Sequence, residues 1–242
     1  MRAGHYVKPI KNEVEYNAAL ATYEALRIQS IQAAEAARCH ERTAQLVSKI
    51  PLRFRHKTWA DFKVMYPGQL TVKKAAERFV TTFDERLSEG TCLLFQGKPG
   101  TGKTFLSLLI YRALAERGVA VSYESSLHFL KAIQEKKFES HAGFNAVIDH
   151  YRQLPLLIID EVSEGCGKEG YLAEWERSLL FAVIDARYQA QRCTIVISNR
   201  TKPDLIERLG TPIIDRLCEN GVMMGFEWDS YRQQPNPSNN HS

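Results

Sequence analysis

Residues 93–114 read LLFQGKPGTGKTFLSLLIYRAL, in which an apolar run, a glycine-rich turn and a second apolar run follow one another. The first run has the length and composition of a buried strand, and the second has those of a helix packed against it. The turn between them, GKPGTGKT, fits the pattern G-x-x-x-x-G-K-[ST] at every position. A strand, this loop and a helix in that order are the context in which the pattern binds phosphate.

The residue types of this loop predict how a nucleotide would be held. Glycines let the backbone turn tightly and bring N–H groups up to phosphate oxygens at the positive end of the following helix. We expect Lys103 to reach the β- and γ-phosphates and the Thr104 hydroxyl to ligate Mg²⁺. The alternative is a glycine-rich turn that binds nothing. The expected ATP-binding residues are Gly97, Lys98, Pro99, Gly100, Thr101, Gly102, Lys103 and Thr104.

Two further apolar runs end in polar side chains that suit the same chemistry. Leu156–Ile159 leads into Asp160 and Glu161, about 60 residues after the loop, as a buried parallel strand ending in two carboxylates. We expect Asp160 to hold the Mg²⁺ shell and Glu161 to orient or deprotonate the attacking water. The run at 193–198 ends at Asn199, whose amide would position the water or sense the γ-phosphate; the alternative is an Asn that caps the following turn.

Composition narrows the class of protein. The 242 residues are 44% hydrophobic and 25% charged, which suits one domain of about 170–200 residues with an appendage. The net charge is +4, and residues 1–60 alone contribute +5, from ten Lys and Arg against five Glu. The five cysteines are scattered, so neither a disulfide framework nor a zinc ribbon is expected. With no signal peptide and no apolar run long enough to span a membrane, we expect a cytoplasmic protein without membrane contact.

The N-terminal part predicts a long helix that docks onto another protein. Residues 12–47 lack Gly and Pro and are rich in Ala, Glu, Gln and Arg. Tyr16, Leu20, Tyr23 and Leu26 form a short apolar stripe at helical spacing. A solvated helix with no partner is the alternative. Residues 53–62 then interleave basic and aromatic side chains, which indicates either nucleic-acid contact or, as we favour, packing of the linker against the next domain.

The remaining pattern alternates helix and strand. It predicts helices over 71–87, 127–138, 145–153, 175–189, 202–209 and 213–217, and strands over 119–123 and 222–226. The helix over 127–138 carries Lys131, Lys136 and Lys137, a weak candidate for DNA phosphate contact. We therefore expect an α/β three-layer domain with a parallel central sheet. Its expected bounds are an N-terminal helical arm at 1–52, the ATPase domain at 53–232 and a disordered polar tail at 233–242.

The order of these motifs resembles that of AAA+ ATPases. More narrowly, residues 96–103, 158–161, 198–199 and the segment 209–216 resemble the bacterial replicative helicase loaders of the DnaC type, over about residues 54–232. The ending FEWDSYR at 226–232 discriminates best among related ATPases. The N-terminal 50 residues match the family in helical character only. Cys39-His40 without further ligands does not fit the zinc module of some related loaders.

The resemblance implies partners and two further site residues. It implies that residues 12–50 grip the hexameric replicative DNA helicase, and that ATP-bound AAA+ domains self-associate and engage single-stranded DNA. By position, Arg216 would be the arginine finger given to a neighbour's ATP, and Arg232 the second sensor. A surface ion pair is the alternative for Arg216. Two other functions stay open: a transposase-helper ATPase acting on duplex DNA, and an adaptor that switches with negligible turnover.

Overall fold

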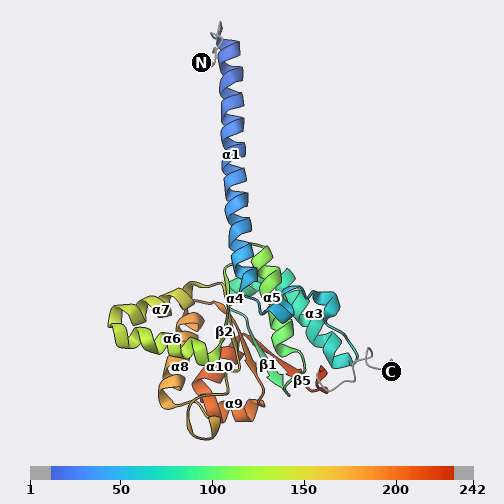
Figure 1. Cartoon of the computed structure of the whole chain (residues 1–242), viewed down its shortest axis with the longest axis vertical. Helices are drawn as coiled ribbons and strands as arrows, with labels where there is room; N and C mark the ends of the chain where they lie inside the picture. Colours follow the sequence, from blue (N-terminus) through green and yellow to red (C-terminus); the bar gives the residue numbers. More distant parts are fainter. Residues whose placement is uncertain (1–11, 232–242) are drawn as a thin grey trace. The chain divides into compact units, whose positions relative to one another are not determined.

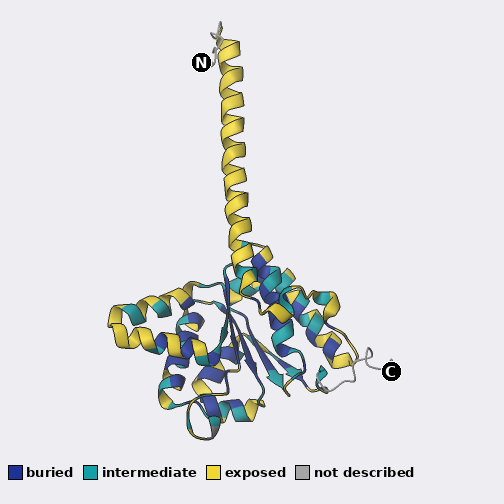
Figure 2. Ribbon diagram, viewed as in Figure 1, coloured by how far each residue is buried: buried dark blue, intermediate teal, exposed yellow. Residues whose placement is uncertain are grey.

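The computed structural model describes residues 12–231, except for the side chain of Glu169. The chain divides into two compact units, Met1–Gln45 and Leu46–Ser242. Helix α1 (Glu13–Ser48) forms the described part of the first unit and contributes its last residues to the second. The residues of α1 up to Arg42 are exposed, as the yellow ribbon in Figure 2 shows. The expected helix is therefore confirmed.

The second unit is built on a five-stranded parallel sheet (Figure 1). Its strands are β1 (Cys92–Gly97), β2 (Val121–Ser125), β3 (Leu156–Asp160), β4 (Cys193–Ser198) and β5 (Gly221–Phe226). They lie in the order β2-β3-β4-β1-β5, and every neighbouring pair is parallel. Because parallel strands share one direction, the carboxyl ends of β1, β3 and β4 meet at a single edge of the sheet, where ligands bind in open α/β folds.

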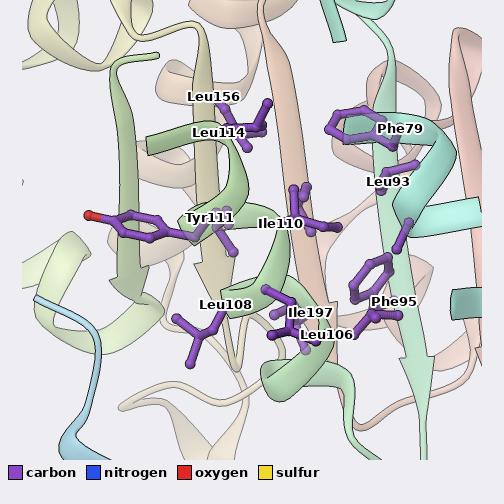
Figure 3. Close-up of a cluster of buried hydrophobic side chains, with 14 of the residues drawn as sticks. Phe79, Leu93, Phe95, Leu106, Leu108, Ile110, Tyr111, Leu114, Leu156 and Ile197 are labelled. Atoms are coloured by element: carbon purple, nitrogen blue, oxygen red, sulfur yellow. The ribbon is translucent and has the colours of Figure 1, made fainter. Parts of the chain in front are cut away.

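Helices cover both faces of this sheet and make it the middle of three layers. Leu93 and Phe95 point to a cluster that also contains side chains of α3 (Pro67–Thr81) and α5 (Lys103–Glu116) (Figure 3). Leu94 points the other way, into a second cluster. That cluster is supplied by α6 (Ser126–Glu139), α7 (His141–Gln153), α8 (Glu174–Gln189), α9 (Lys202–Leu209) and α10 (Thr211–Glu219). Burial on both faces explains why the strands read as continuous apolar runs.

The second unit begins before residue 50 because the end of α1 belongs to its core. Leu46 and Val47 pack against the first cluster, and Ile50 is 2% exposed. The hydroxyl of Tyr111 on α5 donates a hydrogen bond to the Leu46 carbonyl at 3.0 Å. The short helices α2 (Leu52–Arg55) and η1 (Trp59–Asp61) follow. The functional boundary expected between residues 52 and 53 stays a prediction.

The predicted helix over 71–87 is wrong at its start and at its middle. The structure has α3 followed by a separate α4 (Phe83–Glu89). Helix α3 begins earlier because Pro67 occupies its first turn and the buried Gln69 side chain accepts the N–H groups of Met65 and Tyr66. It stops near Thr82, where the Thr82 hydroxyl donates to the Arg78 carbonyl at 2.9 Å and so competes with continued helix.

Two other features of the described chain need mention. A short 3₁₀ helix, η2 (Lys168–Gly170), lies in the loop between β3 and α8. Within residues 12–231, none of the helices is both long and apolar enough to cross a membrane.

Candidate functional site

The glycine-rich loop at 97–104, here called the phosphate loop, connects β1 to α5. Gly97 has φ 136°, and a Cβ atom built there would lie 2.3 Å from the Phe226 carbonyl oxygen. Gly102 has φ 97° and lies against the rings of Phe62 and Tyr231, 3.2 Å from where its Cβ would be. Both positions therefore admit only glycine without strain, because L side chains rarely adopt this backbone region.

Lys103 opens α5 with its side chain folded into the loop. It is 5% exposed, and its Nζ donates to the carbonyls of Gly97 at 2.6 Å and Lys98 at 2.7 Å. The Thr101 hydroxyl closes the same turn by donating to the Lys98 carbonyl at 2.8 Å. A buried ammonium at the N-terminus of α5 gives the loop the concentrated positive charge that suits a phosphate.

The Asp160 carboxylate is the meeting point of three elements. Its Oδ2 accepts hydrogen bonds from the Thr104 hydroxyl at 2.8 Å and the Tyr123 hydroxyl at 2.7 Å. Its Oδ1 accepts the Glu161 N–H at 2.9 Å. Burial, with the nearby Asp160 charge, raises the pKa of Tyr123, so its hydroxyl stays protonated and remains a donor. Sequence reasoning missed Tyr123, because its position in the middle of the short strand β2 carries no motif.

Glu161 and Asn199 follow β3 and β4 and lie at the same edge of the sheet. Glu161 is exposed and has φ 60°, an unusual conformation for a residue with a side chain. The N–H of the next residue, Val162, donates to the Ile197 carbonyl at 3.1 Å, which ties this turn to β4. The structure therefore brings the carboxylate and the amide to one site, as the sequence predicts.

A cavity of about 430 Å³ lies over this edge. It is lined by Pro99, Gly100, Gly102, Lys103 and Thr104 from the phosphate loop, by Asp160, Glu161, Ile197 and Asn199 from the strand ends, and by Arg53, Phe54, Lys57, Asp61, Phe62, Lys63, Phe105 and Tyr231. Gly97, Lys98 and Thr101 belong to the same loop without lining the cavity. Its volume is in the range of ordinary small-molecule sites.

The linker forms one wall of this cavity through its aromatic side chains. Phe54 stacks on Phe105 of α5 with ring centroids 5.6 Å apart. Phe62 lies 6.0 Å from Phe105 and 6.2 Å from Tyr231, again between ring centroids. The preferred interpretation of this segment, packing against the domain, is confirmed. Its basic side chains still face the cavity: Lys57 pairs with Asp61 at 3.2 Å, and Arg53 lies over the Phe54 ring.

Arg216 lies apart from this cavity, on α10. Its Nε donates to Asp185 Oδ1 at 2.6 Å and its Nη1 to the Pro212 carbonyl at 3.1 Å. The guanidinium also sits 4.7 Å from the centroid of the Phe181 ring. The alternative of an ion pair is thus observed, and the role at a neighbour's nucleotide stays a prediction. Arg232, the expected second sensor, lies outside the described residues.

The residues present fit ATP and Mg²⁺. The phosphate loop turns tightly at Gly97, where a Cβ would meet the Phe226 backbone, and the buried Lys103 supplies positive charge to the loop. The oxygens of Thr104 and Asp160 are already adjacent, and they are the hard donors that Mg²⁺ prefers. Mg²⁺ commonly takes only one or two protein carboxylates and completes its shell with water and phosphate oxygens.

The comparisons with known proteins agree with this geometry. The model of a family described as IstB-like ATP binding protein matches residues 13–238. The replicative helicase loader DnaC of Escherichia coli (strain K12) is 26% identical over 178 residues, which are 73% of this chain and 69% of that protein. Both the expected AAA+ assignment and the likeness to DnaC-type loaders are confirmed.

Solved structures establish the fold. A crystal structure of the DnaC helicase loader matches with a TM-score of 0.64 at 21% identity, covering 72% of this chain and 99% of that one. The replication initiator DnaA bound to AMPPCP and single-stranded DNA matches with a TM-score of 0.60 at 21% identity, covering 75% of this chain and 52% of that one. The expected three-layer P-loop domain with a parallel sheet is therefore confirmed.

Proposed function

The chain belongs to the family of IstB-like ATP-binding proteins, and we propose that within this family it is an ATP-dependent loader of a hexameric replicative DNA helicase. ATP hydrolysis is the activity expected of this family. The observation that carries the narrower proposal is the 26% identity to the DnaC loader across 178 residues, which are 73% of this chain. Loading places the helicase on single-stranded DNA at the start of replication, in the cytoplasm.

Within the nucleotide site, the phosphate loop binds the phosphates of ATP through its backbone N–H groups. Lys103 turns from the loop carbonyls toward the β- and γ-phosphates. Because its ammonium is buried, its electrostatic attraction to the phosphates is stronger than it would be in water. Thr104 and Asp160 would hold Mg²⁺, which neutralises part of the phosphate charge. Tyr123 keeps the Asp160 carboxylate aimed at Thr104 through its 2.7 Å hydrogen bond.

Hydrolysis needs a water molecule activated beside the γ-phosphate. Glu161 accepts the proton of this water. Its side chain is exposed and lines the cavity, so a water molecule in the cavity can reach it. Asn199 orients the same water through its amide. We assign both roles because the two side chains line one cavity with the phosphate loop, although they lie on different strands.

Arg216 acts in trans, on the ATP of a neighbouring subunit. Its guanidinium lies on α10, away from its own chain's cavity, and is paired with Asp185. A fixed guanidinium suits a phosphate because it stays charged and offers two parallel donors. ATP-dependent self-association would bring it to the neighbour's γ-phosphate. Arg232 serves as the second sensor in this proposal.

Residues 12–50 of the N-terminal arm bind the helicase. Tyr16, Leu20, Tyr23 and Leu26 are 54%, 43%, 64% and 59% exposed on α1, an apolar stripe with its side chains in solvent. Such a stripe is the usual anchor of a helix that docks into a groove. Residues 12–50 hold four Lys and Arg against five Glu, so the proposed contact rests on the apolar stripe and not on net charge.

Single-stranded DNA is the second macromolecular partner. Helix α6 presents exposed Lys131, Lys136 and Lys137, with Phe138 at 81% exposure next to them. Lysines can neutralise phosphates, and an exposed ring can stack on a base. Lys136 is paired with Glu139 at 2.7 Å, so part of its charge is already compensated.

The test is capture of the hexameric helicase by the full-length protein with ATP present. Replacing Leu20 and Leu26 together by Asp should abolish capture, because it places two charges in the stripe. Replacing Ala18 and Ala25 by Asp adds the same charge to the opposite face of the same helix and should leave capture intact. Both variants should bind ATP like the wild type.

A transposase-helper ATPase is the competing function. The family description names ATP binding and no macromolecular partner, so it separates the two functions less well than the DnaC identity does. A wild-type protein that ignores helicase but binds duplex DNA together with a transposase would replace the loader proposal by this one.

A further inference from the structure

The segment 226–231 contacts the phosphate loop through two hydrogen bonds to its backbone carbonyls. The indole Nε1 of Trp228 donates to the Thr101 carbonyl at 2.9 Å, and the backbone N–H of Tyr231 donates to the Gly100 carbonyl at 3.0 Å. Trp228 is only 8% exposed and its ring packs 5.0 Å from that of Phe226. Two consecutive carbonyls of the phosphate loop are thus fixed by residues more than a hundred positions later.

These bonds also decide where the loop's N–H groups point. In a trans peptide the C=O and the N–H lie on opposite sides of the chain. No cis peptide bond occurs within the described residues. The N–H groups of Thr101 and Gly102 therefore point away from the two carbonyls that Tyr231 and Trp228 hold. That opposite side is where a cradle for phosphate needs its donors.

We infer that Trp228 and Tyr231 are positioning residues for phosphate binding, which orient the phosphate loop before the nucleotide arrives. The inference rests on the proposed ATP site and adds residues that touch the loop without holding the nucleotide's phosphates themselves. A loop whose donors are already aimed loses less conformational entropy on binding than a mobile one.

The same segment is anchored at its other end. The Tyr231 hydroxyl donates to the Lys63 carbonyl at 2.6 Å, in the linker that lines the cavity. Burial raises the pKa of Tyr231 to about 12, so at neutral pH this hydroxyl is protonated and can donate. A Cβ at Gly68 would lie 3.3 Å from the Trp228 ring, so the start of α3 closes around the indole. Trp228 and Tyr231 thus connect the phosphate loop to both the linker and the start of α3.

Packing alone does not account for the tryptophan. A buried indole N–H needs an acceptor, and a phenylalanine would fill most of the same space without that need. For the Trp228 indole, this acceptor is the Thr101 carbonyl of the phosphate loop. Of the two hydrogen bonds that hold the loop, the one from Trp228 is made by a side chain, so a single substitution removes it.

The test compares Trp228→Phe with Trp175→Phe, the same change in a partly buried residue of α8 that packs in the other cluster. Loss of one buried hydrogen bond should weaken binding of a fluorescent ATP analogue by about three- to tenfold in Trp228→Phe. Inorganic pyrophosphate, which can reach only the phosphate loop, should lose affinity by a similar factor in competition. Trp175→Phe should bind both as the wild type does.

A measurement on the wild-type protein avoids the question of whether the variant folds. The chain has three tryptophans, so its indole N–H signals can be resolved and assigned by nuclear magnetic resonance. Addition of pyrophosphate should shift the Trp228 signal and leave the Trp175 signal in place.

Unchanged pyrophosphate affinity in Trp228→Phe, or an indole signal that does not respond, would overturn the inference and leave Trp228 as a core residue only. A fall in the unfolding temperature without a fall in affinity would do the same. A wild-type protein that does not bind the ATP analogue at all would instead remove the ATP site, and the inference with it.

Discussion

The Thr104 hydroxyl donates a hydrogen bond of 2.8 Å to the Asp160 carboxylate, which joins the first turn of α5 to the end of β3. These two oxygens lie 56 positions apart in sequence and come from two neighbouring parts of the fold. Their contact means that the two proposed Mg²⁺ ligands lie side by side at the site. Sites built on rigid elements in this way need little rearrangement on binding.

Lys103→Ala should abolish ATP binding. The change removes a buried ammonium that supplies charge to the phosphate loop, at a cost of about 2–5 kcal/mol by comparison with other buried charge pairs. Binding of a fluorescent ATP analogue measures this directly. Lys74→Ala, at an exposed position of α3, is the matched control and should bind normally. Unaltered binding by Lys103→Ala would remove the phosphate-loop assignment.

Glu161→Gln should bind ATP and fail to hydrolyse it. An amide cannot accept the proton of the attacking water, whereas the backbone and the size of the side chain stay the same. Phosphate release should fall by a factor of about 10²–10⁴, and the ATP-bound assembly should accumulate in size-exclusion chromatography. Wild-type turnover in this variant would mean that another group acts as the base.

Arg216→Ala should bind ATP normally and fail to hydrolyse it. An arginine finger supplied in trans contributes about 10³–10⁵ to the rate. Mixing this variant with Lys103→Ala subunits should restore part of the activity, because each mixed interface can combine an intact ATP site with an intact Arg216. If mixing gives no rescue while wild-type activity rises with protein concentration, Arg216 has only its observed role beside Asp185.

Tyr123→Phe should raise the Mg²⁺ concentration needed for half-maximal ATP hydrolysis by about tenfold, as is usual when a group supporting a metal ligand is lost. The hydroxyl donates to the same Asp160 oxygen as Thr104, so its removal frees that carboxylate to turn. ATP binding measured without Mg²⁺ should not change. Tyr111→Phe removes a hydroxyl bonded to the Leu46 carbonyl and serves as the control. Equal Mg²⁺ dependence in the two variants would contradict the role of Tyr123.

The sequence predicts the strand ends well because the relevant signals are local. The phosphate loop and the Asp160-Glu161 pair each follow an apolar run, and β4 and α9 lie where the pattern places them. Parallel strands then bring Asn199 to the other residues without further information, since their carboxyl ends share one edge.

The residues that the sequence does not assign depend on contacts between distant segments. Tyr123 reaches Asp160 across 37 positions and Trp228 reaches Thr101 across 127. Periodicity reports which face of an element is apolar, and it says nothing about which hydroxyl or indole finds which acceptor. The break in the helix over 71–87 was missed for another reason: Thr82 bonds to the Arg78 carbonyl, and such competition has no apolar signature.

The left-handed backbone at Glu161 makes the best residue for stability differ from the best residue for activity. A residue other than glycine in such a conformation costs about 1–3 kcal/mol, and Asn tolerates it better than Glu does. Glu161→Asn is thus expected to give a more stable protein that has lost its proposed catalytic base. Descendants selected only for persistence of the fold would drift away from Glu at this position, whereas lineages that depend on turnover would keep it.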